Sequence, residues 1–145
     1  MDRSSDETAI ALQALSRDAG LRNWRLKGVE RLPVIQGGMG VGVSAGRLAG
    51  TVAGLGGMGT ISAVDLRRLH PDLMARTAHL NAEPDAGQRI DAANLEALGR
   101  EIARARELSG GRGLVAVNVM KALTAYEAYL RHAMACGIDA LVVGA

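Results

Sequence analysis

A glycine-rich run holds the residue types best suited to binding a cofactor. It reads Gln-Gly-Gly-Met-Gly-Val-Gly-Val-Ser over residues 36–44. Without β-carbons, glycines let main-chain N–H groups approach a phosphate or a planar ring closely, and the N-terminus of a following helix favours negative charge. The run therefore predicts a loop that binds a cofactor through its backbone. The alternative is that the glycines serve only tight packing between a strand and a helix.

Asn118 is the second candidate, because it is a polar amide near the end of an otherwise apolar run, residues 114–120. At the carboxyl end of a parallel strand, an amide can hydrogen-bond a flavin or a substrate carbonyl. It can equally hold a neighbouring loop, and the sequence leaves both roles open. Ser62 ends another apolar run, 58–62, and Asp65 follows it, so we expect both at the same rim.

A dinucleotide-binding interpretation competes for the same glycines. Residues 40–45 satisfy the pattern G-x-G-x-x-A, and Asp65 lies about 20 residues further on, as in Rossmann-type domains. However, the glycines begin earlier, directly after Gln36, and Asp65 falls three residues past Ser62, beyond the expected strand. The Rossmann-type module stays as an alternative.

The histidines and the single cysteine predict no further site. No carboxylate or cysteine stands at metal-ligand spacing from any of the three histidines, so no metal is expected. Cys136 excludes an internal disulfide and falls near the end of an apolar helical pattern. We therefore expect a buried structural thiol there.

Strands and helices alternate along the rest of the chain. Short apolar runs predict strands at 32–36, 58–62, 114–120 and 138–145. Helical spacing of apolar residues predicts helices over 44–53, 91–109 and 123–136, with a short helix and a loop within 63–88. Residues 1–31 form an expected N-terminal helical leader. Alternation across glycine turns favours a parallel α/β sheet with right-handed crossovers.

Composition narrows the class of protein. The 145 residues are 48% hydrophobic but only 2% aromatic, which suits aliphatic strands buried in a parallel sheet. A formal charge of +2, with acidic and basic residues interspersed, is no nucleic-acid footprint. No window approaches the roughly 18 apolar residues of a membrane span. The expectation is a soluble cytoplasmic protein that binds neither nucleic acid nor membrane.

Four segments, taken together and in order, resemble the strand motifs of the nitronate monooxygenase (2-nitropropane dioxygenase) family. They are residues 32–44, 56–62, 115–120 and 137–145. The resemblance implies a parallel (β/α)8 TIM barrel, with about its first four β/α units in this chain and residues 32–145 as its N-terminal half. It also implies FMN as cofactor and the oxidation of alkyl nitronates with O2. Homo-oligomerisation is left open.

The family's site residues carry over to positions that match its motifs. Gly38, Met39 and Gly40 would contact the flavin through backbone groups, and Asn118 would hydrogen-bond it. Gly144 and Ala145 would begin a loop on the substrate side of the ring. The family's catalytic histidine, in a Gly-Gly-His segment, would lie beyond Ala145. A truncated chain, inactive and poor at binding FMN by itself, is therefore expected.

Other functions remain open from the sequence. Flavin-dependent enoyl-ACP reductases share the Gln-Gly-Gly-Met opening, and some relatives act as NAD(P)H:quinone reductases. These alternatives belong to the same barrel family and also use FMN. From a different class, the chain could be an inactive fragment or the Rossmann-type binding module described above.

Overall fold

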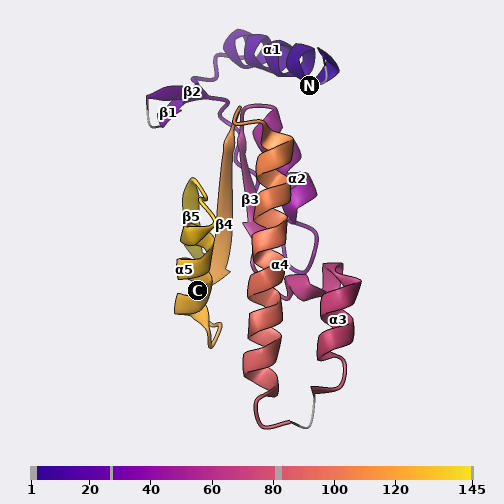
Figure 1. The fold of residues 1–145 in the computed structure, drawn as a ribbon. Coiled ribbons are helices and arrows are strands. Elements are labelled where there is room, and N and C mark those ends of the chain that lie inside the picture. Colours follow the sequence, from indigo (N-terminus) through magenta and orange to yellow (C-terminus); the bar gives the residue numbers. More distant parts are fainter. Residues whose placement is uncertain (1–2, 27, 81–82, 145) are drawn as a thin grey trace.

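The computed structural model of the chain describes residues 3–26, 28–80 and 83–144, which form two sheets and a set of helices (Figure 1). The elements in order are α1 (Arg3–Asp18), β1 (Trp24–Leu26), β2 (Val29–Arg31), α2 (Gly46–Gly54), β3 (Met58–Ser62), the 3-10 helix η1 (Leu66–Leu69), α3 (Pro71–Thr77), α4 (Ala86–Ser109), β4 (Leu114–Met120), α5 (Tyr126–Ala135) and β5 (Ala140–Gly144). Strands β3 and β4 span the predicted ranges. Helix α4 begins about one turn earlier than predicted, after Asp85.

The larger sheet is parallel, with strand order β3-β4-β5. Its register places Ser62 beside Asn118, and Asn118 beside Val142. Because parallel strands end at the same edge, these residues lie together at the carboxyl end of the sheet. The rim expected for Ser62 and Asn118 is therefore present.

The expected first strand, 32–36, is reduced to an isolated parallel bridge between Ile35 and Met58. The N–H of Met58 donates to the carbonyl of Val34, and the N–H of Gln36 donates to the carbonyl of Met58, both at 2.9 Å. Pro33 has no N–H to add to a ladder, and the chain leaves β3 after Gln36 for the glycine run. The segment thus directs the glycine run to the sheet without becoming a strand of it.

The predicted (β/α)8 TIM barrel is wrong. The described residues form an open three-stranded parallel sheet and a separate two-stranded antiparallel sheet, β1-β2, with no barrel. Alternating strands and helices specify parallel pairing, but closure depends on strand number, tilt and stagger, which apolar periodicity does not encode. The hairpin β1-β2 was also missed: the region expected to be a helical leader holds α1 and this hairpin.

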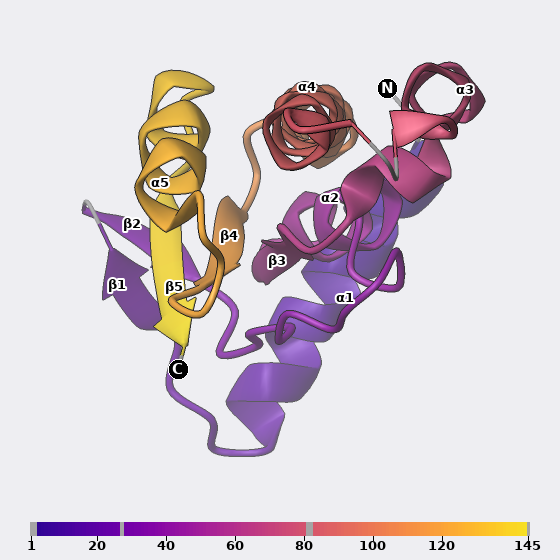
Figure 2. The same cartoon turned by 90° about the horizontal axis from the view of Figure 1, so that it is seen from below.

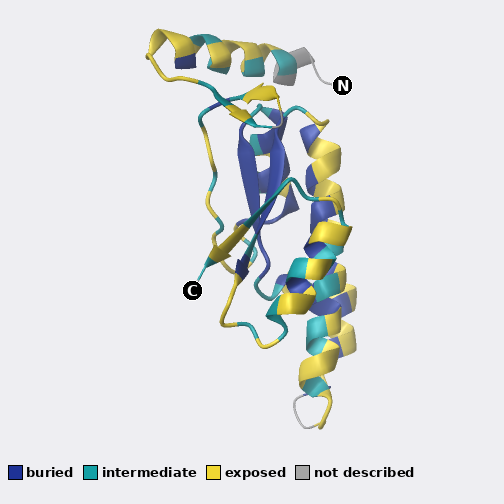
Figure 3. Cartoon of the chain, turned by 90° about the vertical axis from the view of Figure 1, so that its left-hand side faces the viewer, coloured by how far each residue is buried: buried dark blue, intermediate teal, exposed yellow. Residues whose placement is uncertain are grey.

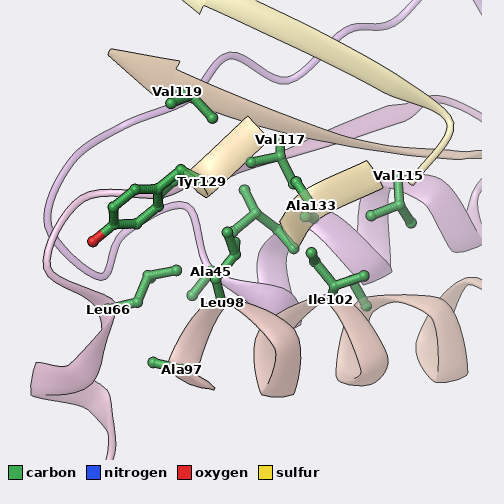
Figure 4. Close-up of a cluster of buried hydrophobic side chains, with 14 of the residues drawn as sticks. Ala45, Leu66, Ala97, Leu98, Ile102, Val115, Val117, Val119, Tyr129 and Ala133 are labelled. Carbon is green, nitrogen blue, oxygen red and sulfur yellow. The ribbon is translucent and has the colours of Figure 1, made fainter. Parts of the chain in front are cut away.

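Helices α2, α4 and α5 pack against one face of the parallel sheet (Figure 2). From β4, Val115, Val117 and Val119 point into this layer, where they meet Leu98 and Ile102 of α4 (Figure 4). Each of these side chains is at most 1% exposed. Burial of an aliphatic side chain stabilises a fold by roughly 1.5–3 kcal/mol, so this layer is the main source of stability.

Two segments of the chain pack on the opposite face of the sheet. Near the amino ends of the strands, Trp24 and Leu26 of the hairpin pack against a small cluster of Met58, Leu114 and Ala116. Beyond it, towards the carboxyl ends, the glycine run approaches the sheet at Asn118. Strands β3 and β4 are therefore buried on both faces, whereas α1 is largely exposed and β5 is half-buried to exposed (Figure 3). No helix among the described residues is long and apolar enough to cross a membrane.

Candidate functional site

The glycine loop, residues 37–43, is held at both ends by two polar side chains. The Oε1 atom of Gln36 accepts a 3.0 Å hydrogen bond from the N–H of Thr60, and its Nε2 donates at 2.8 Å to Oγ of Ser44. Oγ of Ser44 also accepts from the N–H of Met39 at 2.8 Å and donates to the carbonyl of Gly37 at 3.1 Å. Ser44 is fully buried, so its hydroxyl fixes the loop from inside.

Several backbone N–H groups of the glycine loop have no hydrogen-bond acceptor within the described part of the chain. The N–H groups of Gly38, Gly40 and Gly42 donate to no acceptor among the described residues. Gly42 has a φ of 79°, a left-handed conformation that glycine adopts without strain. The side chain of Met39 is 45% exposed. The loop therefore presents free donors beside an exposed apolar side chain.

Gly38 lies directly against Asn118. A β-carbon built on Gly38 would be 2.6 Å from Nδ2 of Asn118 and 2.7 Å from its Cβ, closer than side-chain atoms approach each other. The structure thus brings together two of the predicted site residues, one from the loop and one from β4. Only glycine allows this approach of the loop to the sheet.

Two polar atoms under the loop lack a hydrogen-bond partner. The Oδ1 atom of Asn118 and the Oγ1 atom of Thr60 are both buried and have no partner within the described part of the chain. The two residues lie on neighbouring strands, and Thr60 is paired with Ala116, two residues before Asn118. Buried polar atoms are nearly always hydrogen-bonded, and orphaned ones mark a place for a water or ligand. Because side chains alternate along a strand, Thr60 and Asn118 point to the same face of the sheet, the one that the glycine loop approaches.

The remaining predicted residues lie at or beyond the sheet edge. Gly144 is the last residue of β5 and pairs with Met120, and its carbonyl accepts a 2.9 Å hydrogen bond from the N–H of Lys121. Space around Gly144 is open. The expected substrate-side residue Ala145 lies outside the described residues. Gly144 is therefore at the predicted edge, although it does not touch Asn118.

Asp65, which the Rossmann interpretation needs for a ribose, is engaged by arginines. Its Oδ1 is 3.0 Å from Nε of Arg67, and its Oδ2 pairs with Nε of Arg68. Asp65 also has a φ of 49°, the left-handed conformation that Asp tolerates better than most side chains. Its carboxylate helps to shape the turn between β3 and η1.

Several polar side chains, including Tyr129 and Asn94, lie near the turn between β3 and η1. The Tyr129 hydroxyl lies 3.4 Å from Oδ1 of Asp91, and the residue is only 2% exposed. Burial raises the pKa of Tyr129, and the negative charge of Asp91 adds to the effect. Asn94 caps the turn from the other side, since its Oδ1 accepts a 3.0 Å hydrogen bond from the N–H of Arg67. Asn94 therefore helps to hold the turn between β3 and η1.

Glu101 and His70 form a pair that the sequence interpretation missed. Glu101 is 3% exposed on α4, and its Oε1 lies 3.1 Å from Nε2 of His70. A signal was present, because Glu101 stands at helical spacing among the buried residues Leu98, Ile102 and Ala105. A carboxylate within an apolar stripe has to find a partner inside the protein.

The other titratable side chains offer no metal centre. No group of three or more His, Cys, Asp or Glu within the described residues could hold a metal ion. Cys136 is half-buried, with Sγ 3.6 Å from Nε2 of His132. The thiol expected to be buried is thus only partly buried, at the edge of the main hydrophobic core.

The fold and the site define a class: an α/β protein with a glycine loop at the carboxyl end of a parallel sheet, the usual position of ligand sites in such sheets. No protein-family model matches the chain, and no curated protein matches it either. The interpretation of the site therefore depends on its own residues and on the motif resemblance described above.

Proposed function

We propose that this chain forms part of the flavin site of an FMN-dependent oxidoreductase that oxidises alkyl nitronates with O2. One observation carries the proposal: the buried Oδ1 of Asn118 has no partner, and it lies beneath a loop whose Gly38 and Gly40 N–H groups are also free. A free donor on Gly38 and a free acceptor on Asn118 thus lie close together without satisfying one another. The choice of nitronate as substrate follows from the motif resemblance.

The residues present fit the edge of a flavin ring. A flavin carries carbonyl oxygens and ring nitrogens that accept hydrogen bonds, and one ring N–H that donates. The free N–H groups of Gly38 and Gly40 would serve the acceptors, and Oδ1 of Asn118 would accept from the donor. Because Gly38 covers Asn118, binding includes a small displacement of the loop from that side chain. When bound, FMN supplies the electron transfer between substrate and O2.

The chain itself contributes orientation and exclusion of water. Gln36 and Ser44 hold the ends of the loop, so only its middle has to move from Asn118 when a ligand binds. Preorganised donors cost less ordering entropy on binding than mobile ones do. The exposed side chain of Met39 would lie over the apolar part of the ring and displace water from it. These roles require no titratable side chain in the loop.

The test is flavin binding by the complete reading frame that contains these residues. The protein is expected to purify with flavin absorbance, or to quench the fluorescence of added FMN, and to consume O2 when an alkyl nitronate is supplied. Asn118→Ala should weaken FMN binding about tenfold, the effect of one lost hydrogen bond to a buried group. A colourless, folded protein that does not bind FMN would falsify the proposal.

Asn23→Ala is the matched control, because Asn23 also has a buried Oδ1 without a partner but lies before β1, away from the carboxyl end of the sheet. It should leave FMN affinity unchanged. Equal losses in both variants would show that the effect comes from general destabilisation. Reduction of bound flavin by NAD(P)H, without nitronate oxidation, would reject the nitronate assignment and favour a reductase.

A further inference from the structure

Glu101 places a carboxylate inside the protein at the start of α2. Its Oε2 accepts a 2.7 Å hydrogen bond from the N–H of Gly46, the first residue of that helix, and its side chain is 4% exposed. The first N–H groups of a helix have no partner within the helix, and the helix dipole favours negative charge there. Glu101 therefore holds the N-terminus of α2 from the neighbouring helix α4.

The glycine loop ends just before this contact. Ser44, two residues before Gly46, donates its N–H to the carbonyl of Met39 at 3.1 Å, and its own carbonyl accepts from the N–H of Ser62 at 2.9 Å. A β-carbon on Gly46 would overlap the carbonyl oxygen of Glu101. The backbone from Ser44 to Gly46 is thus held between β3 and α4, and this backbone sets where the glycine loop ends.

We propose that Glu101 is a positioning residue for the glycine loop, acting through the N–H of Gly46 on the backbone that leads to Ser44. It lies on a different helix and touches no ligand. The effect of Glu101 on FMN affinity rests on the proposed function. The effect on the loop itself does not, because it follows from the hydrogen bond to Gly46 in the protein without flavin.

Two conservative variants of Glu101 separate the effect of side-chain length from the effect of charge. Glu101→Gln keeps the length of the side chain and an oxygen that accepts from Gly46, but it removes the charge facing His70. Glu101→Asp keeps the charge and shortens the side chain by one methylene group, so the hydrogen bond to Gly46 is lost. If Glu101 acts through that hydrogen bond, Glu101→Gln should keep the conformation of the glycine loop, and Glu101→Asp should make the loop more mobile. Glu107→Ala, on the exposed side of α4, is the control.

The experiment is hydrogen–deuterium exchange of the full chain without flavin, followed by titration with FMN. In Glu101→Asp, the hydrogen-bonded amides of Met39, Ser44 and Gly46 should exchange about tenfold faster than in the wild type, while those of β4 keep their rates. Glu101→Gln and Glu107→Ala should match the wild type within about twofold. FMN affinity should fall about tenfold in Glu101→Asp and remain in Glu101→Gln.

Three outcomes would overturn the inference. These are unchanged exchange of the loop in Glu101→Asp, faster exchange of β4 to the same degree as the loop, or a loop released by Gln but retained by Asp. If the wild type binds no FMN, the proposed function fails, and the exchange rates still decide whether Glu101 positions the loop.

Discussion

Gly38 of the glycine loop lies in direct contact with Asn118 of the central strand β4. No β-carbon fits between them, since one built on Gly38 would be 2.6 Å from Nδ2 of Asn118. The residues are 80 positions apart in the sequence, and the parallel sheet brings them together. Close approach of backbone to side chain is the usual reason for a glycine whose φ is not positive.

Gly38→Ala should destabilise the protein by about 1–3 kcal/mol, because the new methyl group must displace either the loop or Asn118. Gly37→Ala is the matched control, since a β-carbon there meets nothing within 4 Å. It should change the free energy of unfolding by no more than about 0.5 kcal/mol. Urea unfolding of both variants measures the difference. Equal stabilities would mean that the loop does not rest on Asn118.

A substitution at Gly59 of β3 tests how closely α2 approaches the sheet. A β-carbon on Gly59 of β3 would overlap the backbone carbonyl oxygen of Ala49, and backbone cannot move aside as a side chain can. Gly59→Ala should therefore cost more than about 3 kcal/mol or prevent folding, the upper end of overpacking effects. Thermal unfolding followed by circular dichroism measures it.

Gly87→Ala, in the first turn of α4, provides the comparison for that glycine. Its surroundings are open, and alanine is the better helix former, so the variant should be more stable by about 0.5–1 kcal/mol. A Gly59→Ala protein as stable as the wild type would contradict the contact between α2 and β3.

The sequence predicted local elements well where apolar patterning is strong. The run 114–120 is a strand because its aliphatic residues are buried on both faces, and Gly110, with a φ of 52°, ends α4 as a helix-terminating glycine should. The placement of Asn118 and the glycine run at one edge was also within reach, since each stands at the end of an apolar run expected to be a parallel strand. The strand and the end of α4 depend on residues close together in the sequence, whereas the shared edge depends on the parallel pairing of distant segments.

Features that depend on distant packing were not predictable. Barrel closure was expected from a motif resemblance, yet the number of strands that pair is a property of the whole sheet. The hairpin β1-β2 contains only three residues per strand, too few for a periodic pattern. Glu101 was missed because its partners, Gly46 and His70, come from two other segments.

The ion pair between Asp72 and Arg100 should make stability depend on pH in acid. Arg100 donates hydrogen bonds of 2.9 and 2.7 Å to the two carboxylate oxygens, which lowers the pKa of Asp72 from 3.8 to about 2. A depressed pKa contributes stability that is present above the unfolded value and is lost as pH falls through the folded value. The loss should therefore occur between about pH 4 and about pH 2.

Two measurements check this pair. In an NMR titration, the carboxyl carbon of Asp72 should show a pKa of about 2 in the wild type, and a value near 3.8 in Arg100→Gln. The stability difference between wild type and Asp72→Asn should disappear over the same acidic window. Because both side chains are partly exposed, the difference should also shrink in about 1 M salt. An unshifted titration of Asp72 would refute the pair.

Asn118→Leu should separate stability from binding. The Oδ1 atom of Asn118 is buried without a partner, and replacing an unsatisfied polar group by an apolar one of similar shape is neutral or stabilising, here by up to about 1 kcal/mol. The same change removes the acceptor proposed for the flavin, so FMN affinity should fall at least about tenfold. Urea unfolding without flavin and a fluorescence titration with FMN measure the two effects.

The contrast between two asparagines makes this prediction specific. Asn23→Leu also replaces a side chain whose Oδ1 is buried without a partner, so it should be equally neutral or stabilising. It lies before β1, outside the proposed site, and FMN affinity should not change. If Asn118→Leu instead destabilised the protein by more than about 1 kcal/mol, its amide would be serving the fold. The orphaned oxygen would then no longer point to a ligand.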